Sequence, residues 1–153
     1  MADFNGCLEA SSFRVRDRAA WVGDPVYAVL ADTVAAEQGF LEEEAGGYWA
    51  FGWSGQYPSP VIQTYNAETE DYNEYDLLDL IMNHILPGDV CQISVSGNEK
   101  LRYIGGTVWW VSSTGISYIG ATTAWDTKMT VADLRSLRDR FVESVNSMLE
   151  EKV

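Results

Sequence analysis

The sequence predicts a single α+β domain over residues 1–153, an antiparallel sheet of about five to six strands with two or three helices packed on it. Three observations support this fold class. Most strand-like segments are separated by short turns, as in hairpins. Helical segments with recognisable ends lie between and after these strands. The six Trp, eight Tyr and five Phe supply enough apolar surface for one core in a chain of this length.

The N-terminal part is predicted to form one strand and one helix. Residues 11–16 alternate and indicate a strand, which a short turn follows. Asp24 and Pro25 are the residue types expected at the N-cap and first position of a helix. Apolar residues then recur at helical spacing as far as Gly39, a residue type that commonly follows the end of a helix.

The middle of the chain is predicted to form a hairpin, a long loop and a second helix. Gly46-Gly47 marks the turn of the hairpin. Residues 54–66 contain two prolines and several turn formers, so we expect a loop that continues into the acidic run ETEDYNEYD at 68–76. From Asn73 the apolar residues recur at helical spacing, and Pro87-Gly88 ends this helix.

Three further strands are expected at residues 90–95, 105–113 and 115–122, in the order of an antiparallel meander. Trp109 and Trp110 are neighbours in the second of these strands, so their rings must point to opposite faces of the sheet. We expect one ring to lie in the core and the other to be covered by the last helix.

That last helix is predicted to follow TVAD at 130–133, a segment that resembles a capping box. Apolar residues at spacings of three and four give it one face toward the core. The residues of this stripe are Leu134, Leu137, Phe141, Val145 and Met148.

The charge of the chain is distributed unevenly. It has 23 acids and 10 bases, for a net charge of −13. No Lys or Arg lies between Arg18 and Lys100, and an acidic surface of this kind repels nucleic acid and anionic membranes and favours basic partners. The same stretch holds fourteen acids, namely Asp24, Asp32, Glu37, Glu42, Glu43, Glu44, Glu68, Glu70, Asp71, Glu74, Asp76, Asp79, Asp89 and Glu99.

The sequence holds no recognisable catalytic or metal-binding motif. His84 is the single histidine, and no Cys, His or Asp lies at the spacing of a zinc site. Cys7 and Cys91 lie in no CxxC pattern, and we interpret them as reduced thiols of a cytoplasmic protein. GxSxG, P-loop and dinucleotide-binding motifs are also missing. We therefore expect a protein that is not an enzyme and uses no metal or cofactor.

The acidic segments and the tyrosines between them form the predicted partner-binding site. A dense set of carboxylates can compete for a Lys/Arg channel through the same electrostatic steering that attracts DNA. Tyrosines are enriched at interfaces and would serve as anchors, here Tyr57, Tyr65, Tyr72 and Tyr75. The predicted site residues are Glu42, Glu43, Glu44, Glu68, Glu70, Asp71, Tyr72, Glu74, Tyr75, Asp76 and Asp79.

Two segments, SSFRVRD at 11–17 and GNEKLRYIGG at 97–106, carry a resemblance to other proteins. They resemble the pattern of a family of small acidic proteins of phages and bacterial mobile elements. The matched polar residues of the second segment are Glu99, Lys100, Arg102 and Tyr103. By charge and habitat the family is similar to anti-restriction and anti-CRISPR inhibitors. The resemblance implies a basic host protein or nucleoprotein complex as the partner, in the cytoplasm of a host bacterial cell.

The sequence therefore favours a non-enzymatic inhibitor that binds a nucleic-acid-binding defence protein. Its dense carboxylates favour mimicry of the charge of DNA. Two alternatives stay open. One is an acidic structural or interaction domain whose charge serves solubility. The other is a small enzyme, which would need a pocket that gathers carboxylates with His84 or a cysteine.

Overall fold

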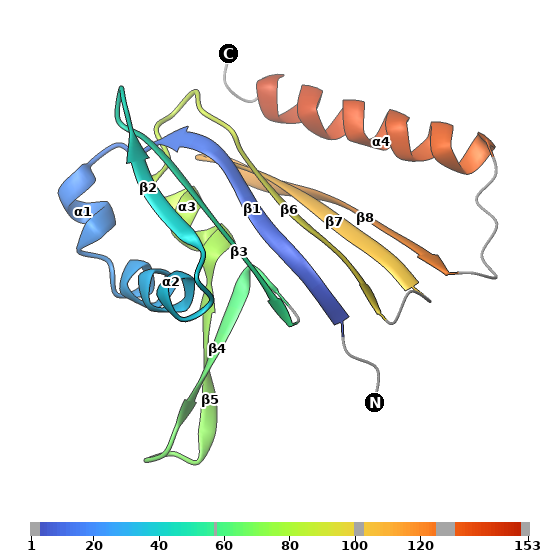
Figure 1. The fold of residues 1–153 in the computed structure, drawn as a ribbon. Coiled ribbons are helices and arrows are strands. Elements are labelled where there is room, and N and C mark those ends of the chain that lie inside the picture. The colour runs from blue at the N-terminus through green and yellow to red at the C-terminus, as the bar shows by residue number, and fades with distance from the viewer. Residues whose placement is uncertain (1–3, 57, 100–102, 125–130, 151–153) are drawn as a thin grey trace.

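The computed structural model describes residues 4–56, 58–99, 103–124 and 131–150. Within these residues it has a six-stranded antiparallel sheet, a separate two-stranded sheet and four helices, which confirms the predicted α+β class (Figure 1). In chain order the elements are β1 (Phe4–Arg14), α1 (Arg18–Val22), α2 (Pro25–Ala36), β2 (Phe40–Glu44), β3 (Tyr48–Gln56), β4 (Val61–Asn66), β5 (Asp71–Asp76), α3 (Leu77–His84), β6 (Cys91–Glu99), β7 (Tyr103–Ser112), β8 (Gly115–Ala124) and α4 (Val131–Glu150).

The main sheet has the strand order β2-β3-β1-β6-β7-β8, so the N-terminal strand lies inside the sheet and β2 and β8 form its edges. Side chains alternate along β1, and Leu8 and Ala10 are buried on the same face. The pairing of β1 with β3 shifts register between Ala10 and Phe13. Such a bulge bends the strand and changes the direction in which the next side chains point. Phe13, just beyond the bulge, is fully buried in the core.

Helices α1, α2 and α3 pack against this face, and each begins with an aspartate cap. The carboxylates of Asp17, Asp24 and Asp76 accept hydrogen bonds from backbone N–H groups in the first turns of α1, α2 and α3, respectively. Trp21 on α1 is fully buried, and its ring makes edge contacts with Phe13 and Trp49. The core therefore lies between these three helices and the sheet.

Helix α4 packs on β7 and β8 (Figure 1). Trp109 pairs with the buried Ile93 and packs against the core, whereas its neighbour Trp110 points to the opposite face. Trp110 is also buried, and its Nε1 donates a hydrogen bond to Gln92. Met148 of α4 is buried as well.

Two expectations about the elements were wrong. Residues 54–66 are not one long loop, because β3 extends to Gln56 and β4 begins at Val61. No helix begins at Asn73, since residues 71–76 form β5 and the Asp76 cap starts α3 at Leu77. The strand expected at 11–16 is confirmed as the end of β1, although β1 begins earlier, at Phe4, and ends at Arg14.

The helix count also differs from the prediction, because the single turn expected after the first strand is the separate helix α1. The expected hairpin turn is confirmed, since Gly46 and Gly47 have φ of +83° and +78°, a region that favours glycine. The predicted cap at Thr130 and the segment 100–102 lie outside the described residues, as do the side chains of Leu134, Leu137 and Phe141.

Candidate partner-binding surface

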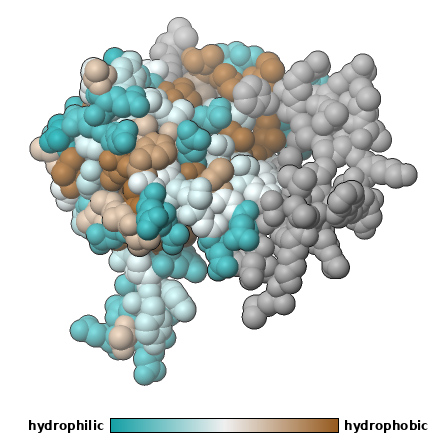
Figure 2. All heavy atoms as spheres, viewed as in Figure 1, coloured by the Kyte–Doolittle hydropathy of each residue, from teal (hydrophilic) through white to brown (hydrophobic). Residues whose placement is uncertain are grey.

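The hairpin of β4 and β5 projects from the body of the molecule (Figures 1 and 2). Its base is anchored by Ile62 and Tyr75, which pair across the strands and pack in or against the core. Beyond this base the hairpin is solvated on both faces, and Glu68, Glu70 and Asp71 at its tip are exposed. An isolated two-stranded hairpin is only marginally stable, so these core contacts at its base hold it in place.

One face of the hairpin carries two cross-strand pairs. Tyr65 lies opposite Tyr72, with ring centroids 5.4 Å apart in an edge-to-face arrangement. Both residues remain largely exposed, Tyr65 at 59% and Tyr72 at 60%. Next to them, the Gln63 amide donates a 2.9 Å hydrogen bond to Glu74 Oε1. This face, which we call the tyrosine face, consists of Gln63, Tyr65, Tyr72 and Glu74.

The carboxylates of the hairpin have no cationic neighbour within the described residues. The ion pairs found there involve Arg14, Arg18 and His84, and none reaches Glu68, Glu70, Asp71 or Glu74. Asp71 Oδ1 accepts only a local hydrogen bond from the Tyr72 N–H. These four acids therefore concentrate negative charge on a narrow projection.

Asp76 and Asp79 lie at the start of α3 and differ from the other predicted site residues. Asp76 is half-buried and caps the helix, with its Oδ1 accepting a 2.8 Å hydrogen bond from the Leu78 N–H. Asp79 is exposed in the first turn, where a negative charge stabilises the positive end of the helix dipole. Both residues thus have a role in forming α3.

The other predicted acids, Glu42–Glu44 on β2, lie at the opposite end of the molecule from the tip of the β4–β5 hairpin (Figure 1). Two of them are engaged locally. Glu43 forms a 2.8 Å ion pair with Arg18, and Glu44 accepts a hydrogen bond from Ser12. The predicted site residues therefore do not form one surface, and the hairpin is the part of the predicted site where acids and exposed tyrosines meet.

A cavity of about 660 Å³ opens at the base of the hairpin, between the end of α2 and the end of β3. Its lining includes Glu74 and Gln63 of the tyrosine face together with Glu37 and Trp53. Glu37, Trp53 and Gln63 are not among the site residues that the sequence predicts. The linear sequence holds no signal for the Gln63–Glu74 pair, because this pair depends on the register of β4 against β5.

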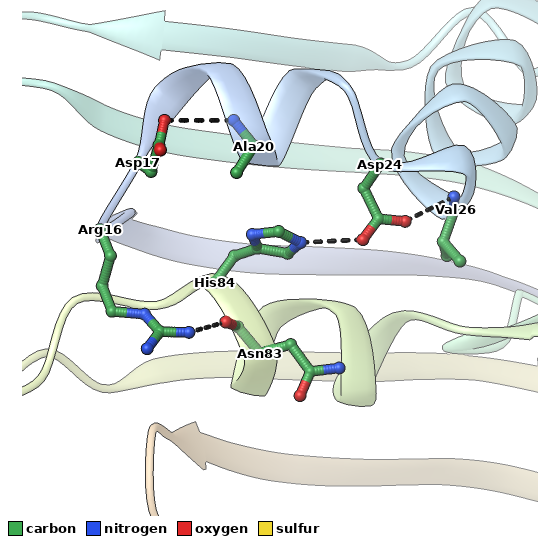
Figure 3. Close-up of polar contacts among 7 residues, drawn as sticks. All are labelled: Arg16, Asp17, Ala20, Asp24, Val26, Asn83 and His84. Atoms are coloured by element: carbon green, nitrogen blue, oxygen red, sulfur yellow. Dashed lines mark hydrogen bonds and ion pairs between the residues drawn. The ribbon is translucent and has the colours of Figure 1, made fainter.

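A second polar cluster connects the first three helices (Figure 3). His84 Nε2 at the end of α3 lies 2.8 Å from Asp24 Oδ2, while the other oxygen of Asp24 caps α2 through the Val26 N–H. Burial raises the pKa of Asp24, but the hydrogen bonds from His84 and Val26 outweigh it and leave the pKa below its ordinary value of 3.8. Arg16 donates a hydrogen bond to the Asn83 carbonyl beside it.

The two cysteines have different environments. Burial raises the pKa of Cys91 to about 12, so this thiol stays protonated. Cys7 is exposed, with its Sγ 3.6 Å from Ser96 Oγ, and it lines a second cavity of about 470 Å³ with Glu9 and Glu37. In the described part of the chain, no group of three or more His, Cys, Asp or Glu side chains could hold a metal ion.

No family model, curated protein or solved structure matches this chain. Among the described helices, none combines the length and apolar character needed to cross a membrane.

Proposed function

We propose that this protein is a non-enzymatic inhibitor that binds a basic, nucleic-acid-binding surface of a host defence protein, of the anti-CRISPR or anti-restriction type. The observation that carries the proposal is the projecting hairpin, on which four exposed acids have no ion-pair partner in the described residues and lie beside two exposed tyrosines. Charge of one sign on a projection accelerates encounter with a surface of opposite sign.

The β4–β5 hairpin with its acids Glu68, Glu70, Asp71 and Glu74, here called the acidic finger, does not reproduce the charge density of a DNA duplex. Duplex DNA carries one charge per roughly 1.7 Å of its axis, whereas neighbouring residues of a strand are about 3.3 Å apart. Since Glu42–Glu44 lie at the other end of the molecule, they do not extend the charged row of the hairpin. A narrow finger fits a channel or groove that normally holds a nucleic-acid strand.

Tyr65 and Tyr72 would supply the apolar and cation–π contacts to the partner that carboxylates cannot make. Exposed aromatic rings bury large apolar areas at interfaces, and their faces attract Arg and Lys. The cavity at the base of the hairpin places Glu37 and Glu74 beside Trp53, a suitable environment for one basic side chain of the partner.

Reversal of charge on the finger tests the proposal. The triple variant Glu70→Lys, Asp71→Lys, Glu74→Lys should lose inhibition and fail to capture the partner from a host bacterial lysate. It should stay folded, because exposed charges contribute little to stability. The matched control reverses Glu42, Glu43 and Glu44 to Lys and should retain both activities. Equal capture by the finger variant and the parent would exclude the hairpin as the binding site.

The enzyme alternative has one observation in its favour, the cavity that brings exposed Cys7 to Glu9 and Glu37. A nucleophilic thiol is activated by a positioned base or a nearby positive charge, and the described lining of this cavity contains no His, Lys or Arg. We expect Cys7→Ser to keep inhibition within about tenfold, or about 1.4 kcal/mol. A larger loss in the folded variant would favour the enzyme.

A further inference from the structure

The two edges of the main sheet differ in length and in charge. β2 has five residues, of which three are glutamates, and charges on an edge strand oppose pairing with another strand. β8 has ten residues and pairs with β7 over its whole length without a register shift. No residue from Tyr103 to Trp125 is charged.

Within the described residues no strand pairs with the outer side of β8. A long edge strand without charge or proline presents a row of backbone N–H and C=O groups to a further strand. Tyr118 and Ile116 of β8 lie on the same face as half-buried Trp109 and remain 68% and 36% exposed. This edge therefore combines backbone pairing capacity with exposed apolar side chains.

We propose that β8 pairs in antiparallel orientation with β8 of a second copy of this chain, which forms a two-fold symmetric dimer with one continuous sheet. A basic partner finds no carboxylate along this strand, whereas an identical neutral strand meets no repulsion there. The acids of β2 lie at the opposite edge of the sheet, and the acidic hairpin projects elsewhere (Figure 1). The acids of β2 and of the hairpin in the two copies are thus kept apart.

The sequence of β8 is also complementary to itself. When Tyr118 lies opposite its symmetry mate, Ile116 lies opposite Gly120 of the second copy. A large side chain then faces a residue without one on both sides of the symmetry axis. An interface of this isologous kind closes as a dimer and leaves no β8 edge for further growth.

The first test is the mass of the purified protein in solution, measured by sedimentation and light scattering across the micromolar range. We expect a dimer, and Tyr118→Lys should make it monomeric because like charges then meet at the centre of the interface. The matched control is Tyr72→Lys on the hairpin, where the parent ring is 60% exposed, and it should remain dimeric. A monomeric parent protein, or a dimer insensitive to Tyr118→Lys, would overturn the proposal.

A second test reports the register. Residues directly opposite in an antiparallel pair have Cα atoms about 4.5–5.5 Å apart, which lies within the range of about 4.4–6.8 Å that a disulfide spans. The variant Cys7→Ser, Tyr118→Cys should therefore form a disulfide-linked dimer on oxidation, whereas Cys7→Ser, Tyr72→Cys should not. A dimer in which position 118 fails to cross-link uses another surface, and that result would also overturn the proposal. Neither test involves the host partner.

Discussion

At the scale of single residues, Asp24 connects two helices with its two carboxylate oxygens. One oxygen caps α2 and the other lies against His84 at the end of α3. His84 also contacts the buried ring of Trp21, with centroids 5.8 Å apart. His84 is the single histidine of the chain. Through these contacts it holds α3 against α1 and α2, so its role here is structural.

The lowered pKa of Asp24 makes this contribution dependent on pH. Because the carboxylate is favoured in the folded state, its stabilisation is present above the ordinary value of 3.8 and is lost as the pH falls through the lower folded value. Asp24→Asn keeps a capping oxygen but removes the charge, and it should cost about 1 kcal/mol at neutral pH. Urea unfolding should show this difference shrinking below about pH 4. A difference that stays constant into acid would contradict the assignment.

At the scale of elements, α4 and the β4–β5 hairpin are attached to the body in different ways. The hairpin is anchored at one end through Ile62 and Tyr75. Helix α4 packs along β7 and β8 on the face opposite the main core, with Met148 buried. We infer that α4 is an integral part of the fold, whereas the hairpin beyond its base contributes little to the stability of the fold.

Truncation of Met148 tests the role of α4. Met148 is 4% exposed, so Met148→Ala should create a cavity and cost roughly 2–5 kcal/mol of unfolding free energy. The adjacent Leu149 is 52% exposed, and Leu149→Ala should change stability by no more than about 0.5 kcal/mol. Denaturant unfolding measures both variants. Equal, small effects would mean that α4 docks loosely and serves a partner.

At the scale of the whole molecule, the ion pairs among the described residues all lie on the body of the protein, and none lies on the hairpin. Arg14, Arg18 and His84 form ion pairs with Asp89, Glu43 and Asp24, respectively. The four acids of the hairpin therefore form a projecting negative surface, toward which the basic partner that we propose would be attracted.

Binding of the partner should therefore depend on salt and on the tyrosine face in different ways. Affinity of the parent should fall as salt rises, since the Debye length shortens from about 10 Å at 0.1 M to about 3 Å at 1 M. Tyr65→Ala and Tyr72→Ala should weaken binding by a similar factor at every salt concentration, because they remove packing rather than charge. Titrations against the captured partner at several salt concentrations would separate the two effects. Affinity independent of salt would argue against an acidic contact surface.

The sequence by itself determined the fold class, the Gly46-Gly47 turn, the Asp24-Pro25 helix start and the opposite placement of Trp109 and Trp110. Each depends on local backbone preference or on side-chain alternation, which neighbouring residues specify. Only the tertiary structure decided that residues 61–76 form a projecting hairpin, since its strands are stabilised by pairing with each other and by contacts at its base. It also separated Glu42–Glu44 from the hairpin and brought Glu37 and Trp53 to Glu74. Such proximity depends on how distant segments pack, and linear spacing carries no record of that packing.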